Sequence, residues 1–395
     1  MTSTGIVLSG GGARGAYEVG VLGYLFGAFS RRVGDTPGFD VFNGTSVGAV
    51  NATALASTAH DPVRGVEILS KVWLEQNLSD VLHFNLRQAA RIYRVISGGD
   101  DPSGIFDPRP FTKLVTHKIP WRHLANNLKS KRIRGLTVSM TNLRTGRSTL
   151  YVDRAPGVAL PQSGLRIEVR ASAIRPSHVL ASAAMPVIFP PVRIGNEYFC
   201  DGGIRMNTPT SPAIQMGVDR MLVIGVSTPG KVPSSPPLSE IAAHGIRAPS
   251  ASALLGKALN ALMLDHVDHD LAEVQLVNQI LADAEAVCGE RFLEKLNGQA
   301  NQNGRPSRRL IQTFVLRPSV DIGEIASEHL RTHKLRLGKI LGKAVLRTLD
   351  VGEGASADLA SYVLFDSDFS RALFDLGYND ASACRDELEK FLFSN

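Results

Sequence analysis

The chain has few cysteines and no long hydrophobic run. Its 395 residues include only Cys200, Cys288 and Cys384, which lie far apart and form no CxxC pair. This pattern implies neither a disulfide framework nor a cysteine zinc site, and it favours a reducing compartment. The longest nearly apolar run, from Gly20 to Phe29, is about half the length that crosses a bilayer.

The N-terminus lacks the features of a secretory signal, because no basic segment precedes the short apolar stretch from Gly5 to Ser9. We therefore expect a cytoplasmic protein without a transmembrane helix. The formal net charge of +6 is a mild excess for this length. It does not single out nucleic acid as a partner, but it would favour peripheral contact with an anionic membrane surface.

The order of the apolar segments predicts an α/β fold. Thr4 to Leu8 is typical of a buried strand, and Ala16 to Arg32 has apolar residues at helical spacing. Phe39 to Phe42 predicts a second strand, and the alanine-rich stretch from Val47 to Thr58 predicts a second helix. This alternation favours a three-layer sandwich, in which helices flank a mainly parallel central sheet.

The rest of the chain divides into a core and a helical C-terminal part. We expect residues 1–226 to form the core, with a helical insertion at 61–131, and residues 227–395 to be mostly helical and continuous with the core or packed on it. The Pro- and Ser-rich stretch from Thr228 to Leu238 predicts a mobile loop. Further strands are expected at Ile133–Met140, Arg147–Val152, Glu197–Phe199, Arg220–Val226 and Leu310–Leu316.

A glycine-rich loop joins the first strand to the first helix, and it consists of Gly10, Gly11, Gly12, Ala13, Arg14 and Gly15. Glycines here let successive backbone N–H groups point toward one spot, and the start of the helix adds positive potential. Such a cradle suits either a phosphate or the oxyanion of acyl transfer. The loop also satisfies GxGxxG, the dinucleotide-binding fingerprint, so both interpretations are open at this point.

A second motif, GxSxG, lies between the second strand and the second helix and contains Gly44, Ser46 and Gly48. A nucleophile on a sharp strand-to-helix turn needs small neighbours, because larger side chains would collide with adjacent segments. The pattern therefore predicts that the Ser46 hydroxyl is presented above the edge of the sheet, at the start of a helix.

A third motif, Asp201-Gly202-Gly203, follows the short strand expected at Glu197–Phe199. An Asp-Gly pair is most often a surface turn. The alternative is a carboxylate at a strand end with little bulk around it, where it could act as a base.

In this order, the three motifs resemble the patatin-like phospholipase family. Two more segments resemble it: the Ala/Ser-rich stretch that runs from Ala181 into Pro190-Pro191, and Asn207-Thr208-Pro209. The resemblance covers Gly5 to Val226 and implies a patatin-like fold for the core.

The resemblance also implies a chemistry. Ser46 and Asp201 would form a catalytic dyad, and backbone N–H groups of Gly11, Gly12 and Ala13 would bind the oxyanion, with Arg14 bracing the loop. The implied reaction is hydrolysis of fatty-acyl esters of phospholipids or lysophospholipids through an acyl-Ser46 intermediate. The resemblance implies that the reaction needs no metal and no other cofactor, and that it is independent of calcium.

The sequence leaves three other interpretations open. A Ser-His-Asp triad would have to recruit one of five histidines, none in a recognisable context: His244, His266, His269, His329 and His333. A NAD(P)-binding oxidoreductase would need an acidic residue at the end of the second strand, which Asp35 and Asp40 fit poorly. An acyltransferase, or an effector activated by a partner, would use the same dyad.

The pair His266 and His269, with nearby aspartates, has metal-ligand character. The apolar stripe of the surrounding helix favours a solvated polar face instead.

Overall fold

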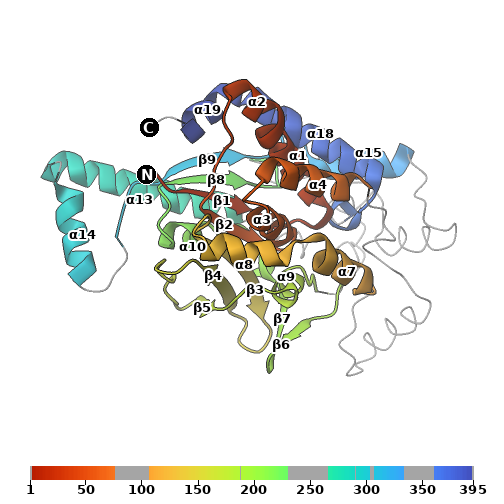
Figure 1. Cartoon of the computed structure of the whole chain (residues 1–395), viewed down its shortest axis with the longest axis horizontal. Helices are drawn as coiled ribbons and strands as arrows, with labels where there is room; N and C mark the ends of the chain where they lie inside the picture. Colours follow the sequence, from red (N-terminus) through yellow and green to blue (C-terminus); the bar gives the residue numbers. More distant parts are fainter. Residues whose placement is uncertain are drawn as a thin grey trace, which may run out of the picture.

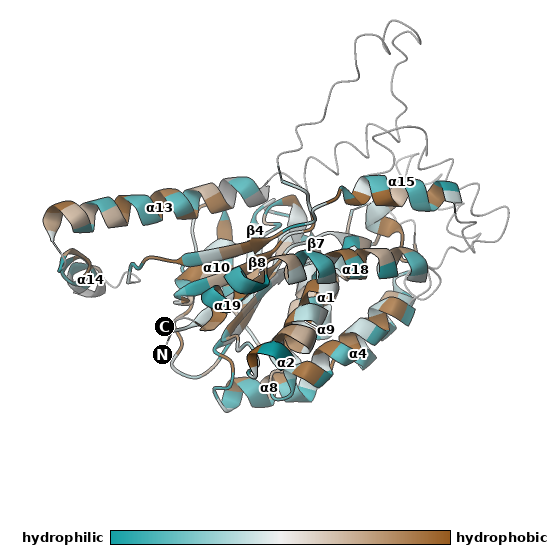
Figure 2. Ribbon diagram, turned by 90° about the horizontal axis from the view of Figure 1, so that it is seen from above, coloured by the Kyte–Doolittle hydropathy of each residue, from teal (hydrophilic) through white to brown (hydrophobic). Residues whose placement is uncertain are grey.

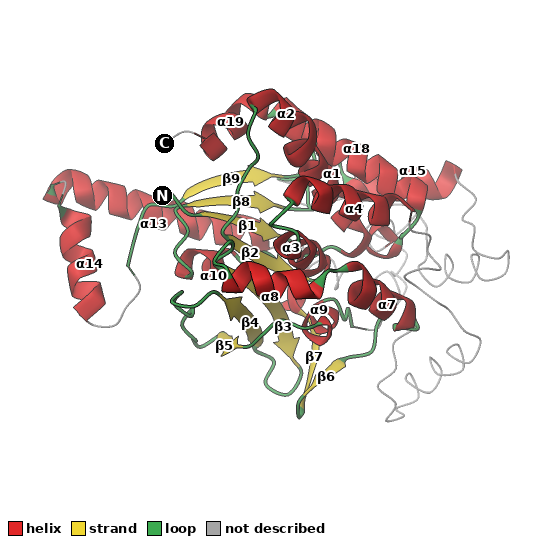
Figure 3. Ribbon diagram, in the orientation of Figure 1, coloured by secondary structure: helices red, strands yellow, loops and turns green. Residues whose placement is uncertain are grey.

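The computed structural model describes residues 2–75, 106–186, 188–229, 266–289, 291–302, 307–332 and 360–393. Their central feature is a nine-stranded sheet with the order β5-β4-β3-β2-β1-β8-β9, to which β7 and β6 are added beside β3 (Figure 3). The strands are β1 (Thr4–Leu8), β2 (Val41–Thr45), β3 (Gly135–Asn142), β4 (Ser148–Arg154), β5 (Ile167–Ala171), β6 (Val192–Ile194), β7 (Glu197–Asp201), β8 (Arg220–Ile224) and β9 (Gln312–Leu316).

The middle of the sheet is parallel and covered on both faces. Strand β1 pairs in parallel with β2 and with β8, and the pairs β2–β3 and β8–β9 are also parallel. Side chains alternate between two apolar cores, so that Ile6 and Leu8 enter one and Val7 enters the other. This two-sided burial explains why the central strands are continuous apolar runs.

Helices form the outer layers, which gives the expected three-layer α/β architecture. Figure 2 shows α13 on one side of the strands and α4 and α8 on the other. The helices on the side of α4 and α8, together with those packed against them, are α1 (Gly15–Tyr24), α2 (Ser30–Val33), α3 (Val47–Ser57), α4 (Pro62–Glu75), α7 (Arg109–Lys118), α8 (Trp121–Lys129), α9 (Pro176–Ser182), α15 (Ile322–Thr332), α18 (Ser367–Ala383) and α19 (Arg385–Phe393). The layer on the other side of the sheet contains α10 (Thr210–Gln215) and α13 (His266–Cys288). Helix α14 (Phe292–Gln302) follows α13 and lies away from the sheet (Figure 1).

Two elements differ from the expectation near the start of the chain. The second strand begins at Val41 rather than Phe39, although the Phe39 ring still packs against Phe26 and Phe42. The single helix expected from Ala16 is interrupted by a π-helical turn, η2 (Leu25–Phe29), before α2. Strands β5 and β6 were not predicted, because both are short and only partly buried.

Some expectations fall on residues outside the described ranges. The helical insertion is represented by α4, α7 and α8, and its residues 76–105 lie outside. Most of the loop expected from Thr228 to Leu238 also lies outside. The division into two parts at residue 226 stays a prediction, and we propose that β9, α15 and α18 belong to the same unit as the core.

The C-terminal helix α18 lies directly on α1, and glycines permit the close crossing. A Cβ added at Gly377 would come within 2.2 Å of the Tyr17 carbonyl oxygen, and one at Gly20 within 2.0 Å of the Phe374 carbonyl oxygen. Helix α1 begins at the last residue of the glycine-rich loop, so the contact between α18 and α1 also fixes the position of the end of that loop.

We expect Gly377→Ala to lower stability by about 1–3 kcal/mol, because the helices must separate to admit the methyl group. The matched control is Gly298→Ala in α14, where a Cβ would meet nothing within 4 Å. The control should be neutral or stabilising by up to about 1 kcal/mol. Thermal unfolding of both variants measures the difference, and equal melting temperatures would contradict the tight crossing.

Candidate active site

The register of strand β3 brings the two distant motifs together. Strand β2 pairs with β3 as far as Thr45 opposite Ser139, and Asp201 of β7 is opposite the next residue, Met140. Strand β4 occupies the other edge of β3 at Met140. Strands β2 and β7 must therefore share one edge of β3, and their ends meet there.

Ser46 occupies the turn between β2 and α3 in a strained conformation. Its φ is 55° and its ψ is −125°, in a region that residues with a Cβ rarely adopt. The flanking glycines have no room for a side chain. A Cβ at Gly44 would lie 2.3 Å from the Gly48 carbonyl oxygen, and one at Gly48 would lie 2.3 Å from the Leu8 carbonyl oxygen. This is the local geometry that the GxSxG spacing predicts.

Asp201 lies within hydrogen-bond distance of Ser46. The Ser46 hydroxyl donates to Oδ2 of Asp201 over 2.6 Å, and the Gly203 amide donates to Oδ1 over 2.7 Å. Asp201 is completely buried. Burial raises the pKa of this carboxyl group to about 7, although the hydrogen bonds from Ser46 and Gly203 act in the opposite direction. Gly202 packs against β3, where a Cβ would lie 2.4 Å from the Ser139 carbonyl oxygen.

The glycine-rich loop lies beside Ser46. The Gly10 amide donates to the Asn207 carbonyl over 3.2 Å, so this amide is already satisfied. Within the described part of the chain, no backbone carbonyl accepts from the amides of Gly11 or Gly12. Gly12 has a φ of 56° and lines the same cavity as Ser46. The loop then continues through a 3₁₀ turn, η1 (Gly12–Arg14), into α1.

The segment before α18 closes over this loop. Nε of the buried Arg14 donates to the Ser361 hydroxyl over 2.7 Å, and its guanidinium lies 4.2 Å from the centre of the Tyr362 ring. A Cβ at Gly12 would lie 2.1 Å from the Tyr362 carbonyl oxygen. No sequence signal marked Ser361 or Tyr362, because neither belongs to a motif and both are far from the loop in sequence.

An apolar cavity of about 170 Å³ opens beside Ser46. One face of α3 forms its floor, with Val47, Val50 and Ala54 followed by Thr58, at the spacing of one side of a helix. Its other walls come from α4, α7, the segment after α9 and the segment before α18, including Trp73, Leu69, Leu114, Phe111, Ile188, Phe189, Val363 and Phe365. The lining suits a hydrocarbon chain.

Ser182 of α9 supports the strained turn. Its hydroxyl accepts from the Ser46 amide over 2.8 Å and donates to the Ser139 carbonyl over 2.6 Å. The Thr45 and Ser139 hydroxyls also hydrogen-bond to each other. The Ser46 amide is therefore engaged by a side chain, which the sequence motif alone could not reveal.

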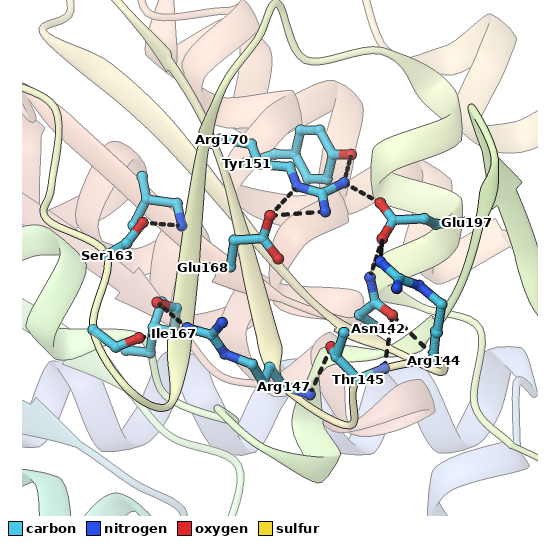
Figure 4. A network of polar contacts seen from close by, with 12 residues as sticks. Asn142, Arg144, Thr145, Arg147, Tyr151, Ser163, Ile167, Glu168, Arg170 and Glu197 are labelled. Atoms are coloured by element: carbon cyan, nitrogen blue, oxygen red, sulfur yellow. Dashed lines mark hydrogen bonds and ion pairs between the residues drawn. The ribbon is translucent and has the colours of Figure 1, made fainter.

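A charged network anchors the far end of β7. Figure 4 shows Arg170 and Arg144 both reaching Glu197, the first residue of β7. The Arg170 guanidinium lies over the rings of Tyr151 and Phe199. Hydrogen bonds from Arg170, Asn142 and Arg144 lower the pKa of Glu197 to about 2. The strand that ends at Asp201 is thus held at its start by ion pairs.

The alternative sites find little support among the described residues. None of the described histidines lines the cavity beside Ser46. His329 contacts Asp366 over 3.1 Å, and His178 caps α9 by accepting from the Arg175 amide. His244 and His333 lie outside the described ranges, as do the side chains of His266 and His269. Asp40 accepts from the Thr4 amide over 2.8 Å, which gives it a structural role at β1.

In the described part of the chain, no group of three or more His, Cys, Asp or Glu side chains could hold a metal ion. None of the helices in the described ranges has both the length and the apolar character needed to cross a membrane.

Three solved structures show some similarity to this chain. VipD from Legionella pneumophila is 14% identical with a TM-score of 0.33, covering 95% of this chain and 67% of VipD. Human GIVD cytosolic phospholipase A2, solved with methyl γ-linolenyl fluorophosphonate, is 14% identical with a TM-score of 0.39, covering 99% of this chain and 59% of that enzyme. ExoU of Pseudomonas aeruginosa, solved with SpcU, is 13% identical with a TM-score of 0.25, covering 99% of this chain and 80% of the matched chain.

The comparisons by sequence identify the family of this chain. None of the curated protein sequences matches this chain. The family model described as patatin-like phospholipase matches residues 6–214, which is more than half of the chain. This range contains the glycine-rich loop, the Ser46 turn and Asp201. The chain therefore belongs to the patatin-like phospholipase family of lipid ester hydrolases.

Proposed function

We propose that this protein hydrolyses fatty-acyl esters of phospholipids or lysophospholipids with Ser46 as nucleophile and Asp201 as its base. The observation that carries the proposal is the 2.6 Å hydrogen bond between the two side chains, beside an apolar cavity that Ser46 lines. Family membership independently supports a lipid ester as substrate.

The proposed reaction begins when Ser46 attacks the ester carbonyl and its proton passes to Asp201. The tetrahedral oxyanion would be bound by the amides of Gly11 and Gly12, which are free of other acceptors among the described residues. Asp201 then returns the proton to the leaving alcohol, and water hydrolyses the acyl-Ser46 intermediate. A carboxyl group with a pKa of about 7 is a far better base than an ordinary aspartate.

The dyad can be tested with a fluorophosphonate probe and a soluble ester. Ser46→Ala should abolish labelling, and both Ser46→Ala and Asp201→Asn should lower ester turnover by about 10³-fold or more. The matched controls are Ser319→Ala and Asp375→Asn, at exposed positions. Full turnover in Asp201→Asn would reject Asp201 as the base.

The pH profile gives a second test. Asp201 must be ionised to accept a proton, and its pKa is about 7. We expect kcat/KM for a short-chain ester to rise about tenfold per pH unit below pH 7 and to level off above it. A profile that is already flat between pH 5 and 8 would show that a group with an ordinary carboxyl pKa controls the reaction.

The cavity floor predicts where the acyl chain lies. From Val47 to Thr58 the helix rises about 16 Å, at about 1.5 Å per residue. Ala54 is near the middle of this path, so Ala54→Phe should block a long chain and spare a short one. We expect kcat/KM for a dodecanoyl ester to fall by about tenfold or more, and that for a butanoyl ester to stay within about twofold.

The control for this experiment is Ala125→Phe, the same substitution on the exposed face of α8. Equal losses for the two esters in Ala54→Phe would indicate general damage rather than a blocked path. No loss for either would place the chain elsewhere.

A further inference from the structure

Glu18 is a buried carboxyl group that the proposed reaction does not use. It lies on α1, one turn after the glycine-rich loop, and is completely buried. Its Oε2 accepts from Nδ2 of Asn51 over 2.8 Å, and Oε1 is buried without a close hydrogen-bond partner in the described structure. A backbone contact with Ser9 also acts on this carboxyl group. A charge in this position would be costly to bury, since no cation among the described residues contacts it.

Asn51 is the junction of a buried network. It lies on α3, five residues after Ser46, and is itself fully buried. Its Nδ2 donates both to Glu18 and to the Gly15 carbonyl, the latter over 3.3 Å. Its Oδ1 accepts from Nε1 of Trp73 over 3.0 Å. An indole N–H can only donate, so Oδ1 must face Trp73 and the amino group must face Glu18.

Trp73 connects this network to the cavity. The residue is buried on α4 and lines the cavity beside Ser46. Its indole stacks with Phe365, with ring centres 6.2 Å apart, and a Cβ at Gly15 would lie 3.0 Å from Cζ2 of Trp73. The ring is therefore placed between the end of the glycine-rich loop and the segment before α18.

We propose that Asn51, oriented by Glu18, is a positioning residue that fixes the Trp73 indole as a wall of the acyl-chain cavity and so sets which acyl chains are accepted. This inference rests on the proposed function, because it concerns the substrate of the same site. Trp73 would contact the chain, while Asn51 and Glu18 act through it.

Complete burial of Glu18, with no cation in contact with it among the described residues, favours its uncharged form. Burial raises its pKa well above the ordinary value of 4.5, against the opposing effects of Asn51 and Ser9. The charged groups of the packed elements face elsewhere. Arg14 reaches Ser361, the Tyr17 hydroxyl is turned toward Asp380 of α18 and toward Cys384, which follows that helix, and α3 carries no titratable side chain. On α4, the titratable residues are all exposed, namely Arg64, Glu67, Lys71 and Glu75.

The test compares isosteric variants on a series of p-nitrophenyl esters from butanoyl to hexadecanoyl. Trp73→Phe keeps an aromatic ring and removes the donor, and Asn51→Leu removes all three hydrogen bonds. Each should change the ratio of kcat/KM between the dodecanoyl and butanoyl esters by about tenfold. The double variant should change it no further, because both substitutions break the same contact.

Glu18→Gln is the conservative rescue. A glutamine carbonyl can still accept from Asn51, so this variant should keep the wild-type chain-length ratio. Its melting temperature should rise relative to the wild type as the pH increases from 5 to 8. The sign follows because unfolded wild type releases a proton above pH 4.5 that folded Glu18 retains, so wild-type stability falls with rising pH.

The outcomes separate this inference from the proposed function. Absence of ester turnover or Ser46 labelling in the wild type would refute the proposed function. With both present, an unchanged chain-length ratio in Trp73→Phe would overturn the positioning role, and this variant keeps the test valid if Asn51→Leu fails to fold. Additive changes in the double variant would also overturn it. A melting-temperature difference between Glu18→Gln and wild type that does not vary with pH would overturn the inference that Glu18 is uncharged in the folded protein.

Discussion

The shared edge of strand β3 is the constraint on which the site depends. Strand β2 leaves that edge at Ser139 and β7 joins it at Met140, so one continuous hydrogen-bonded ladder aligns two segments that are 155 residues apart. A slip of one residue in either pairing would turn Ser46 or Asp201 to the opposite face of the sheet. The ion pairs at Glu197 hold the start of β7, and the Ser182 hydroxyl accepts from the Ser46 amide at the end of β2. Both contacts therefore support the alignment of Ser46 with Asp201.

The residues around the glycine-rich loop come from both ends of the chain. The family match ends at residue 214, yet Arg14 and Gly12 are covered by Ser361 and Tyr362, and the cavity is walled by Val363 and Phe365. Removing this segment would expose a buried guanidinium and open one side of the cavity. The late part of the chain is thus a structural component of the site rather than an appendage to it.

The motifs allowed much of the fold and the site geometry to be predicted, because each depends on local backbone geometry. Glycines at 44 and 48 and the alternation of strands and helices reflect steric rules that act over a few residues. The contacts of Ser361, Asn51 and Glu18 could not be predicted in this way. They are ordinary polar residues whose partners are set by tertiary packing, and a buried glutamate has no distinguishing pattern in a helix. The short, partly buried strands β5 and β6 escaped notice for a similar reason, since they carry little apolar periodicity.

The backbone conformation of Ser46 has a consequence for which residues this position can hold. With φ at 55°, a side chain branched at Cβ would crowd the adjacent backbone, whereas an unbranched one is tolerated at some cost. Threonine carries the same hydroxyl group as serine but is branched, and cysteine is unbranched but carries a thiol. The backbone at position 46 therefore accepts cysteine more readily than threonine, because of the shape of the side chain and independently of its chemistry.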